Sequence, residues 1–395
     1  MNQINNDAGG HSGVLPQQIA QIQTPAPLVE VSRVKRNLDR MADYARLHKL
    51  QLRPHVKTHK TTVIGAAQMR RGAVGLTCAT PREMEIMSSV ASDLLLAHPP
   101  LGLKVDRLLM LPRSVSIVTA LDSVEAIDWV AEAASGASRT VRVYIELDVG
   151  MHRVGVAEAE RVVELAVRVM GESALEYAGI CFYPGHIREA VGDQGEKISA
   201  LNDKLSEVVT ALERAGLKPP VVSGGSTPTA WHTHEMPLVT EFRPGTYVFN
   251  DRTTAAVGAC KWDDCAFTVL ATVVSTAVPG QAVVDAGSKA LGREPMRGVA
   301  GEGFGALVGH EDVLVSAMSE EHGILDLSKT AWRPRVGDTV RIVPNHVCIV
   351  VHLNDVLYAV DGDRVTGVWP VAARGRMAPF TDEEASAAAP AEDLL

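Results

Sequence analysis

Between residues 24 and 246 the sequence alternates between short apolar segments and longer helical ones, and this alternation is the strongest constraint on its fold. Such an alternation is typical of a parallel sheet, and eight strands is the number that closes a barrel. The pattern therefore predicts an α/β fold, a (β/α)8 TIM barrel. An open doubly wound sheet is the alternative, but no GxGxxG follows a first strand. The predicted strands are 52–58, 75–80, 93–98, 116–121, 141–149, 177–183, 220–224 and 240–244.

Helical periodicity fills the intervals between these strands. The first helix is predicted over residues 31–49, where Val34, Leu38, Met41, Ala42 and Ala45 share one stripe. Polar residues and glycines gather after the strands, which is where function lies in a TIM barrel. The other predicted helices are 60–71, 81–90, 102–111, 123–135, 157–170 and 196–215.

The helical periodicity stops after about residue 247. Val/Thr-rich segments broken by Gly, Pro and Asp-Gly follow, which predicts an all-β domain. We therefore expect an N-terminal arm over residues 1–23, partly flexible, and a barrel over 24–246. The β domain is predicted over 247–380 and a disordered tail over 381–395.

Charge and cysteine content limit the class of protein. A net charge of −9 argues against general nucleic-acid binding, which needs a basic excess. Five cysteines in 395 residues do not suggest a disulfide framework, so a reducing compartment is expected. No apolar run approaches the length of a membrane span, and the N-terminus lacks the pattern of a signal peptide. We expect a cytoplasmic protein with neither nucleic-acid nor membrane partners.

The stretch RPHVKTHK, residues 53–60, concentrates cationic side chains in the first predicted strand. Lys57 lies inside this predicted strand. Burying the charge of a lysine there costs free energy unless the amine is paired with a carboxylate or takes part in chemistry. Lys57 either points outward or pairs with a carboxylate such as Asp148, or it is a desolvated lysine that forms a Schiff base. The strand alone does not decide between these interpretations.

Two glycine loops follow the last two predicted strands. SGGSTPT supplies Gly224, Gly225, Ser226 and Thr227, whose backbone N–H groups and hydroxyls suit an anion. RPGTY supplies Gly245 and Tyr247. One such loop could be a plain turn, but phosphates often bind after the late strands of a barrel.

The stretch NHVC places His346 and Cys348 two residues apart in the β domain. On a strand both side chains would project from one face, which suits a borderline metal such as zinc. A buried cysteine beside a surface histidine is as good an interpretation on spacing alone. EEHG, residues 320–323, adds another histidine with acidic neighbours.

Taken in chain order, these motifs resemble those of one family, the D-threonine aldolase and D-serine dehydratase group of fold-type III pyridoxal-phosphate enzymes, relatives of alanine racemase. The resemblance covers about residues 24–376. It rests on an ordered set of motifs, which is stronger than any one of them. They are RPHVKTHK, LDVGMHRVGV (147–156), SGGSTPT, PGTY, VDAGSKAL (284–291), EEHG, PNHVC and VWPVAARG (368–375).

The resemblance implies an alanine racemase-like (β/α)8 barrel with a C-terminal β domain, and a homodimer whose active sites use residues of both subunits. It also implies pyridoxal 5'-phosphate attached to Lys57, and a divalent metal (Mn, Zn, Mg or Co) held near the cofactor by His346 and Cys348. The cofactor-binding residues that it implies besides Lys57 are His55, Arg153, Tyr183, Gly224, Gly225, Ser226, Thr227, Gly245 and Tyr247.

The implied activity is that of a lyase on small D-β-hydroxy-amino acids. We expect a D-threonine aldolase, which cleaves D-threonine to glycine and acetaldehyde, with His186 of FYPGHIR as the base near the β-hydroxyl. Cys348 is instead the pattern of the D-serine dehydratase branch, and His186 could be a surface loop histidine. D-Serine dehydratase and 3-hydroxy-D-aspartate aldolase or dehydratase are therefore alternatives. A non-catalytic pyridoxal-phosphate protein, or a phosphate-binding barrel enzyme without pyridoxal, fits the motifs less well.

Overall fold

A computed structural model describes residues 16–298 and 300–375 of the chain. The predicted tail and residues 1–15 of the predicted arm lie outside the described residues. The chain divides into two compact units, which we call the barrel unit and the β unit. Of the described residues, the barrel unit contains Leu38–Val248, Ala256–Cys260 and 371–375, and the β unit contains 16–37, Phe249–Ala255, 261–298 and 300–370.

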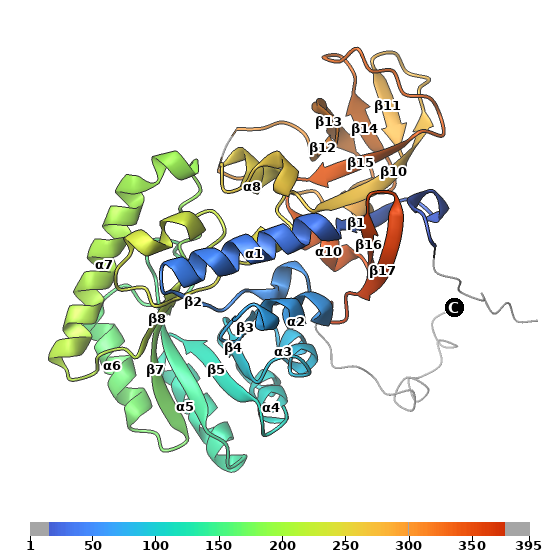
Figure 1. Cartoon of the computed structure of the whole chain (residues 1–395). Coiled ribbons are helices and arrows are strands. Elements are labelled where there is room, and N and C mark those ends of the chain that lie inside the picture. Colours follow the sequence, from blue (N-terminus) through green and yellow to red (C-terminus); the bar gives the residue numbers. More distant parts are fainter. Residues whose placement is uncertain (1–15, 299, 376–395) are drawn as a thin grey trace, which may run out of the picture. The chain divides into compact units, whose positions relative to one another are not determined.

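The barrel unit holds an eight-stranded parallel sheet, which confirms the predicted barrel (Figure 1). Its strand order is β2-β9-β8-β7-β6-β5-β4-β3. A parallel bridge between His55 and Thr77 joins the two ends of this order, and Thr77 N donates to Pro54 O at 2.9 Å. The strands are β2 (Gln51–Leu52), β3 (Leu76–Cys78), β4 (Asp93–Leu96), β5 (Ser116–Leu121), β6 (Val141–Leu147), β7 (Leu175–Phe182), β8 (Val221–Gly224) and β9 (Glu241–Phe242).

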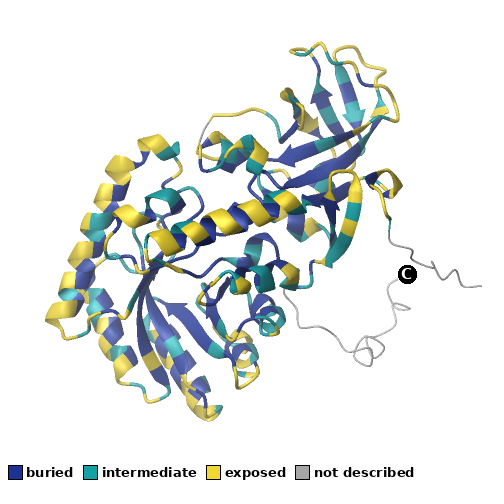
Figure 2. Cartoon of the chain, in the orientation of Figure 1, coloured by how far each residue is buried: buried dark blue, intermediate teal, exposed yellow. Residues whose placement is uncertain are grey.

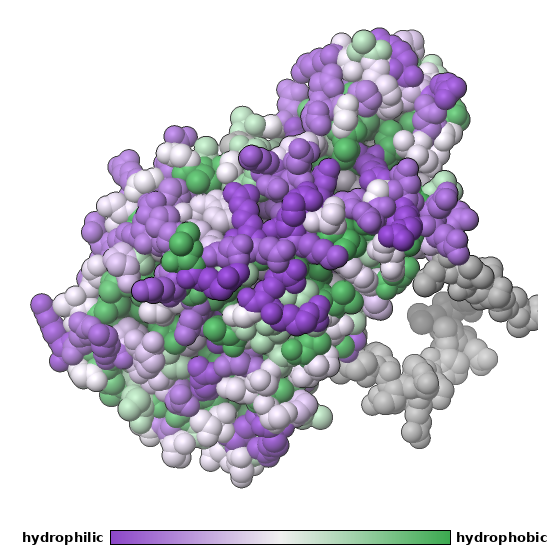
Figure 3. Space-filling model, in the orientation of Figure 1, coloured by the Kyte–Doolittle hydropathy of each residue, from purple (hydrophilic) through white to green (hydrophobic). Residues whose placement is uncertain are grey.

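Amphipathic helices alternate with these strands. In α1 (Val31–Leu47) all five residues of the predicted stripe are buried, whereas the opposite side is polar and appears among the hydrophilic atoms of Figure 3. Figure 2 shows the barrel strands buried and the helices exposed on one side only. The remaining helices are α2 (Thr62–Arg70), α3 (Pro81–Met87), α4 (Leu103–Leu109), α5 (Val124–Gly136), α6 (Ala159–Met170) and α7 (Gly195–Arg214). Among the described residues, none of the helices combines the length and the apolar character that crossing a membrane would require.

Strand alternation separates the two faces of the barrel sheet. On β6, Val143, Ile145 and Leu147 pack in the large core under the helices, whereas Tyr144 belongs to the small apolar cluster of the interior. Glu146 lies two residues after Tyr144 and therefore also faces the interior. The interior is thus where charged side chains can gather at the strand ends.

A buried ionic network lies among the first residues of several barrel strands. Arg53 donates from Nε to Glu241 at 2.7 Å and from Nη1 to Asp93 at 2.6 Å, and Asp93 also accepts from Arg142 at 2.8 Å. Ser223 Oγ donates to the second oxygen of Glu241 at 2.6 Å. Because Arg53 and Glu241 are almost fully buried, each charge depends on its partners.

The β unit holds a nine-stranded sheet of order β11-β14-β13-β12-β15-β10-β1-β16-β17, in which β10 also pairs with β11. All its pairings are antiparallel except β1 with β16. Its strands are β1 (Ala26–Glu30), β10 (Phe267–Ser275), β11 (Gln281–Val284), β12 (Gly305–Leu307), β13 (His310–Met318), β14 (Gly323–Asp326), β15 (Thr339–Pro344), β16 (Val356–Asp361) and β17 (Arg364–Pro370).

The β unit differs from the predicted β domain at its N-terminal edge. Residues 24–30 were predicted in the barrel, but β1 pairs with β10 and β16 of the β unit. Ile19 and Ile22, from the predicted arm, pack with Leu28 and Leu270 in the same unit. The physical reason is that β1 supplies a strand between β10 and β16, a long-range pairing that local periodicity does not reveal.

Candidate active site

The predicted strand over residues 52–58 is shorter in the structure. β2 ends at Leu52, and residues Val56–Thr58 form a 3-10 turn that carries Lys57. Pro54 has no N–H to donate, so the regular ladder ends at Leu52, although extended backbone continues to His55, whose N donates to Pro244 O at 3.0 Å. The side chain of His55 caps the turn, because its Nδ1 accepts from Lys57 N at 3.4 Å.

The turn changes the neighbours that strand alternation would give to Lys57. His59 is fully buried with its Nδ1 3.1 Å from Thr61 O, and Arg53 lies in the ionic network of the barrel interior. Lys60 is buried and paired with Glu83. Of the basic residues in RPHVKTHK, Lys57 and His55 are therefore the two that line the cavity described next.

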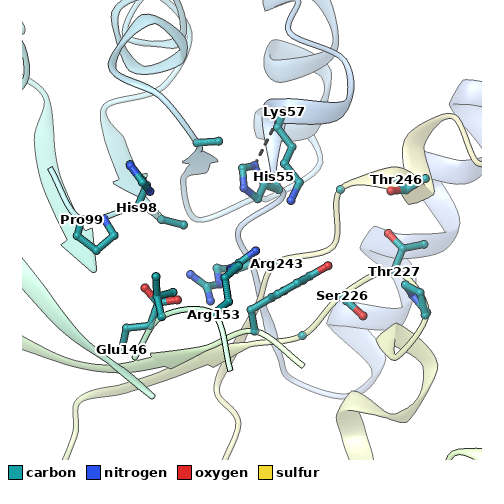
Figure 4. A pocket seen from close by; sticks show the side chains of 17 residues that line it. His55, Lys57, His98, Pro99, Glu146, Arg153, Ser226, Thr227, Arg243 and Thr246 are labelled. Atoms are coloured by element: carbon teal, nitrogen blue, oxygen red, sulfur yellow. Dashed lines mark hydrogen bonds between the residues drawn. The ribbon is translucent and has the colours of Figure 1, made fainter. Parts of the chain in front are cut away.

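A cavity of about 360 Å³ opens at the carboxyl ends of the barrel strands. Figure 4 shows Lys57 and His55 on one wall, Glu146 on another, and Ser226, Thr227 and Thr246 on the side of the late strands. Every lining residue belongs to the barrel unit. The lining residues are His55, Lys57, Ala79, Ala97, His98, Pro99, Glu146, Arg153, Val154, Tyr183, Gly225, Ser226, Thr227, Pro228, Arg243, Gly245 and Thr246.

The two predicted glycine loops meet in this cavity. Gly225 has a φ of +94°, a conformation that favours glycine and turns the chain after β8. Ser226 Oγ lies 3.0 Å from Thr229 Oγ1, and Thr227 Oγ1 accepts from Tyr247 N at 3.1 Å. Gly245 also lines the cavity. These contacts hold both loops against one cavity, as an anion site requires.

Two residues of the predicted cofactor set lie behind the loops. A Cβ on Gly224 would come within 2.2 Å of the Phe182 ring, so this glycine lets β8 pack against β7. The side chain of Tyr247 is buried and its hydroxyl accepts from Gln68 Nε2 at 3.0 Å. Neither residue lines the cavity, and both position residues that do.

Charged groups with unused hydrogen-bonding capacity face the cavity. Among the described residues, Glu146 Oε2 and Arg243 Nη1 are buried polar atoms without a hydrogen-bond partner, although Arg243 Nη2 donates to Phe182 O at 2.8 Å. Burial raises the pKa of Glu146, while the charges of Arg243 and Arg153 oppose that rise. Unpartnered buried polar atoms in a cavity indicate groups that a ligand satisfies.

The ring of Tyr183 lies near two cationic side chains of the cavity, Lys57 and Arg153. Lys57 Nζ lies 5.5 Å from the ring centroid and the guanidinium carbon of Arg153 lies 4.9 Å from it. Burial, together with the charges of Lys57 and Arg243, holds the pKa of His55 well below its usual value. His55 is therefore neutral, and because its Nδ1 accepts a hydrogen bond, its proton resides on Nε2.

These features fit pyridoxal phosphate. Its phosphate matches the two loops, its aldehyde matches an amine at the cavity wall, and its ring polar atoms match the unpartnered arginine and carboxylate. Lys57, His55, Arg153, Tyr183, Gly225, Ser226, Thr227 and Gly245 of the predicted set all line this one cavity.

His186, the predicted base, is not among the lining residues. Its Nδ1 is buried without a hydrogen bond among the described residues, and its Nε2 lies 3.2 Å from the position of a Cβ on Gly150. Burial and the charge of Lys197 lower the pKa of its imidazole. The ring packs against the loop after β6.

The predicted metal ligands belong to the β unit, and they do not lie on a strand. His346 precedes α10 (Val347–Leu353) and Cys348 is in the first turn of that helix. His346 Nδ1 lies 3.2 Å from Asp251 Oδ2, and the Cys348 sulfur hydrogen-bonds the same ring. Burial would lower the pKa of His346, but Cys348 and Asp251 together raise it to about 11.

The donor set suits a borderline divalent ion, because an imidazole nitrogen and a thiolate lie close together. Among residues 16–298 and 300–375, no group of three or more His, Cys, Asp or Glu side chains is arranged to hold a metal. His346 and Cys348 therefore fit a site with two protein ligands whose other positions are open.

Glu146, Arg243 and His98 are cavity residues that the sequence analysis did not select. A signal for Glu146 was present, since Arg142, Tyr144 and Glu146 alternate with apolar residues on β6 and so share the interior face. Arg243 stands in the quoted RPGTY stretch, two residues before Gly245. No local pattern singles out His98.

Comparison with known proteins identifies relatives over nearly the whole chain. The alanine racemase N-terminal domain family matches residues 29–253, and the serine dehydratase domain family matches residues 266–360. The chain is 30% identical to the 3-hydroxy-D-aspartate aldolase of Paracoccus denitrificans (strain Pd 1222), over 90% of this chain and 93% of that protein. It is 33% identical to the D-threo-3-hydroxyaspartate dehydratase of Delftia sp. (strain HT23), over 83% and 91%.

Solved structures agree with these matches. The D-threonine aldolase of Filomicrobium marinum superposes with a TM-score of 0.84 at 30% identity, covering 92% of this chain and 99% of that one. A cysteine-to-alanine variant of a D-threo-3-hydroxyaspartate dehydratase, solved in the metal-free form, superposes with a TM-score of 0.82 at 28% identity, covering 92% and 100%.

Proposed function

The chain belongs to the D-threonine aldolase and D-serine dehydratase family of alanine racemase-like proteins, and from this premise we propose that it is a pyridoxal-phosphate-dependent lyase of D-β-hydroxy-amino acids. The activity that we propose first is cleavage of D-threonine to glycine and acetaldehyde. One observation carries the proposal: Lys57 lines the same cavity as residues of the two glycine loops and two arginines.

The cavity residues divide by the part of the cofactor that they would hold. Gly225, Ser226, Thr227 and Gly245 would bind the phosphate, and Lys57 Nζ would bond to the aldehyde carbon. Bound pyridoxal phosphate supplies an electron-withdrawing ring that weakens the bonds at the substrate Cα.

Arg153 and Arg243 would bind the remaining anionic or acceptor atoms of the cofactor and substrate. Glu146 is close enough to both guanidinium groups for their charges to influence its pKa, so it can orient them. The Tyr183 ring lies near Lys57 Nζ and Arg153 and restricts their motion.

In the aldol cleavage a base takes the proton of the substrate β-hydroxyl, Cα–Cβ breaks, and its electron pair goes to Cα. A proton then returns to Cα to give glycine, and the aldehyde leaves. We propose Lys57 Nζ as the group that returns the proton. His186, the base expected from the sequence, does not line the cavity, and the His186→Ala variant tests whether it acts in this step.

His346 and Cys348 would hold a divalent ion, which supplies Lewis acidity toward a hydroxyl oxygen. Their pairing of an imidazole with a thiolate favours zinc or a similar ion over magnesium. We also propose that the working enzyme is a homodimer, which native mass spectrometry tests.

A dehydratase is the second candidate, and Cys348 favours it, because cysteine at this position is the pattern of the dehydratase branch. In dehydration Lys57 Nζ takes the Cα proton and the hydroxyl leaves with a proton as water. Hydrolysis of the resulting enamine gives a 2-oxo acid and ammonia.

Product analysis separates these activities. The protein, loaded with pyridoxal phosphate and Zn²⁺ or Mn²⁺, is incubated with D-threonine, D-serine and 3-hydroxy-D-aspartate, with the L-enantiomers as controls. Glycine and an aldehyde identify an aldolase, whereas 2-oxo acid and ammonia identify a dehydratase. Full cofactor occupancy without turnover of any D-substrate would refute the proposal.

A further inference from the structure

Asp251 is a fully buried carboxylate of the β unit, and both its oxygens are engaged by hydrogen-bond donors. Oδ1 accepts from Thr254 N at 2.8 Å and from Thr254 Oγ1 at 3.0 Å. Oδ2 accepts from Val347 N at 3.1 Å and lies 3.2 Å from His346 Nδ1. One carboxylate therefore joins the start of α8 (Arg252–Ala256) to the start of α10.

This arrangement determines which nitrogen of His346 is available to a ligand. An ionised carboxylate only accepts hydrogen bonds, so the proton of a neutral His346 lies on Nδ1. The lone pair is then on Nε2, the nitrogen that Asp251 does not contact. Cys348, two residues further on, contacts the same ring.

We propose that Asp251 is a positioning residue for a metal ion bound by His346 and Cys348: it holds His346 in the tautomer and orientation in which Nε2 is a ligand. The inference rests on the proposed function, from which it takes the metal. A carboxylate behind a ligating histidine orients the ring and raises the basicity of the ligand nitrogen.

Asp251 also caps α8, and a purely structural role would account for its burial. Asparagine distinguishes the two roles, because it is nearly isosteric but has only one oxygen. Thr254 and Val347 both present backbone N–H donors, so the amide of an Asp251→Asn variant satisfies one side and opposes the other. If the NH2 faces His346, the ring proton moves to Nε2 and blocks the ligand position.

The test is metal affinity in the full-length chain loaded with pyridoxal phosphate and stripped of metal by a chelator. Co²⁺ is titrated while the thiolate-to-metal absorption band is followed. Asp251→Asn is expected to weaken Co²⁺ binding by about 10–100-fold, with an unchanged cofactor spectrum and a lower melting temperature, because the amide opposes one backbone N–H. The matched control is Asp285→Asn in the same unit, where Asp285 accepts from Thr272 N at 2.7 Å and has no contact with His346.

The outcomes separate the inference from its premise. If His346→Ala and Cys348→Ala bind Co²⁺ as tightly as the wild type, the metal site of the proposed function is wrong. If those variants lose Co²⁺ but Asp251→Asn binds it like the wild type, the role of Asp251 is refuted and the proposed function stands. Equal weakening in Asp285→Asn would also refute it.

A second measurement does not depend on the folding of Asp251→Asn. The ¹⁵N shifts of His346 in the Zn²⁺-loaded wild type report which ring nitrogen carries the proton, and protonated Nδ1 with metal-bound Nε2 is the expected result. Thr254→Val, which frees Asp251 Oδ1 of one donor without changing charge, is expected to weaken Co²⁺ binding less than Asp251→Asn. The opposite tautomer, or unchanged affinity in Thr254→Val when Asp251→Asn does not fold, would overturn the inference.

Discussion

The cavity of the barrel unit and the Asp251–His346–Cys348 group of the β unit are built in different ways. The cavity collects residues that are distant in sequence at the ends of successive strands, and it contains buried polar atoms without partners. The metal motif occupies three consecutive residues whose orientation depends on one carboxylate. The proposed anion-binding site thus depends on the barrel topology, whereas the proposed metal site lies at the start of one helix. Cofactor binding and metal binding should accordingly be separable by mutation.

Lys57→Ala should have the largest effect, because it removes both the attachment point of the cofactor and a proton-transfer group. Turnover is expected to fall by at least about 10²–10⁴-fold. Metal content should be unchanged, since both predicted metal ligands belong to the β unit. Activity assays, mass spectrometry and metal analysis check this, with the exposed Lys218→Ala as control. Covalently bound cofactor in Lys57→Ala would contradict the account.

His346→Ala tests the other side of the comparison. Loss of the ion should cost about 3 kcal/mol of transition-state stabilisation, or roughly 10²-fold in kcat/KM. The cofactor spectrum should be the same as in the wild type. If removing His346 also releases the cofactor, the two sites are not separable.

Glu146→Gln tests whether Glu146 improves cofactor binding while lowering the stability of the folded protein. Burial raises the pKa of Glu146 in the folded state above its value in the unfolded chain. At pH values above the folded-state pKa, the ionised carboxylate therefore destabilises the fold. This destabilisation decreases as the pH falls from the folded-state pKa to the pKa of the unfolded chain. Without cofactor, the variant should melt about 2–4 °C higher than the wild type at pH 8. The difference should shrink at pH 5. Cofactor affinity should fall by about tenfold, because the arginines lose a charged partner.

Melting curves at the two pH values and cofactor titrations measure both effects of Glu146→Gln. Glu176→Gln, at an exposed carboxylate of β7, is the control. A variant that melts below the wild type at pH 8 while binding cofactor normally would show that Glu146 is a structural ion-pair partner.

His186→Ala should have the smallest effect of the four. Because the ring does not line the cavity, kcat is expected to fall less than about tenfold, below the usual contribution of a general base. A loss of 10²-fold or more with normal cofactor content would identify His186 as the base of the aldol step.

Much of the fold could be predicted from the sequence, because the barrel is made of local units. The apolar stripe of α1 and the eight short apolar segments each appear as a local period, and eight strands imply closure. The glycine loops and Lys57 were found for the same reason. Their positions follow from the strand ends.

What could not be predicted depended on long-range pairing or on local exceptions to periodicity. β1 pairs with strands more than two hundred residues away in sequence. The chain leaves the strand direction after His55 and places Lys57 on a turn, and His346 and Cys348 lie at a helix start where a strand was assumed. Glu146 and Arg243 could be recognised as cavity residues only once the barrel fold showed that they line the same cavity.

The central claim is that Lys57 binds pyridoxal phosphate in the barrel cavity, and an absorption spectrum tests it most directly. The protein with pyridoxal phosphate is expected to show a visible band that borohydride abolishes, after which digestion locates the reduced cofactor on the peptide carrying Lys57. The absence of such a band, or a label on another lysine, would contradict the account.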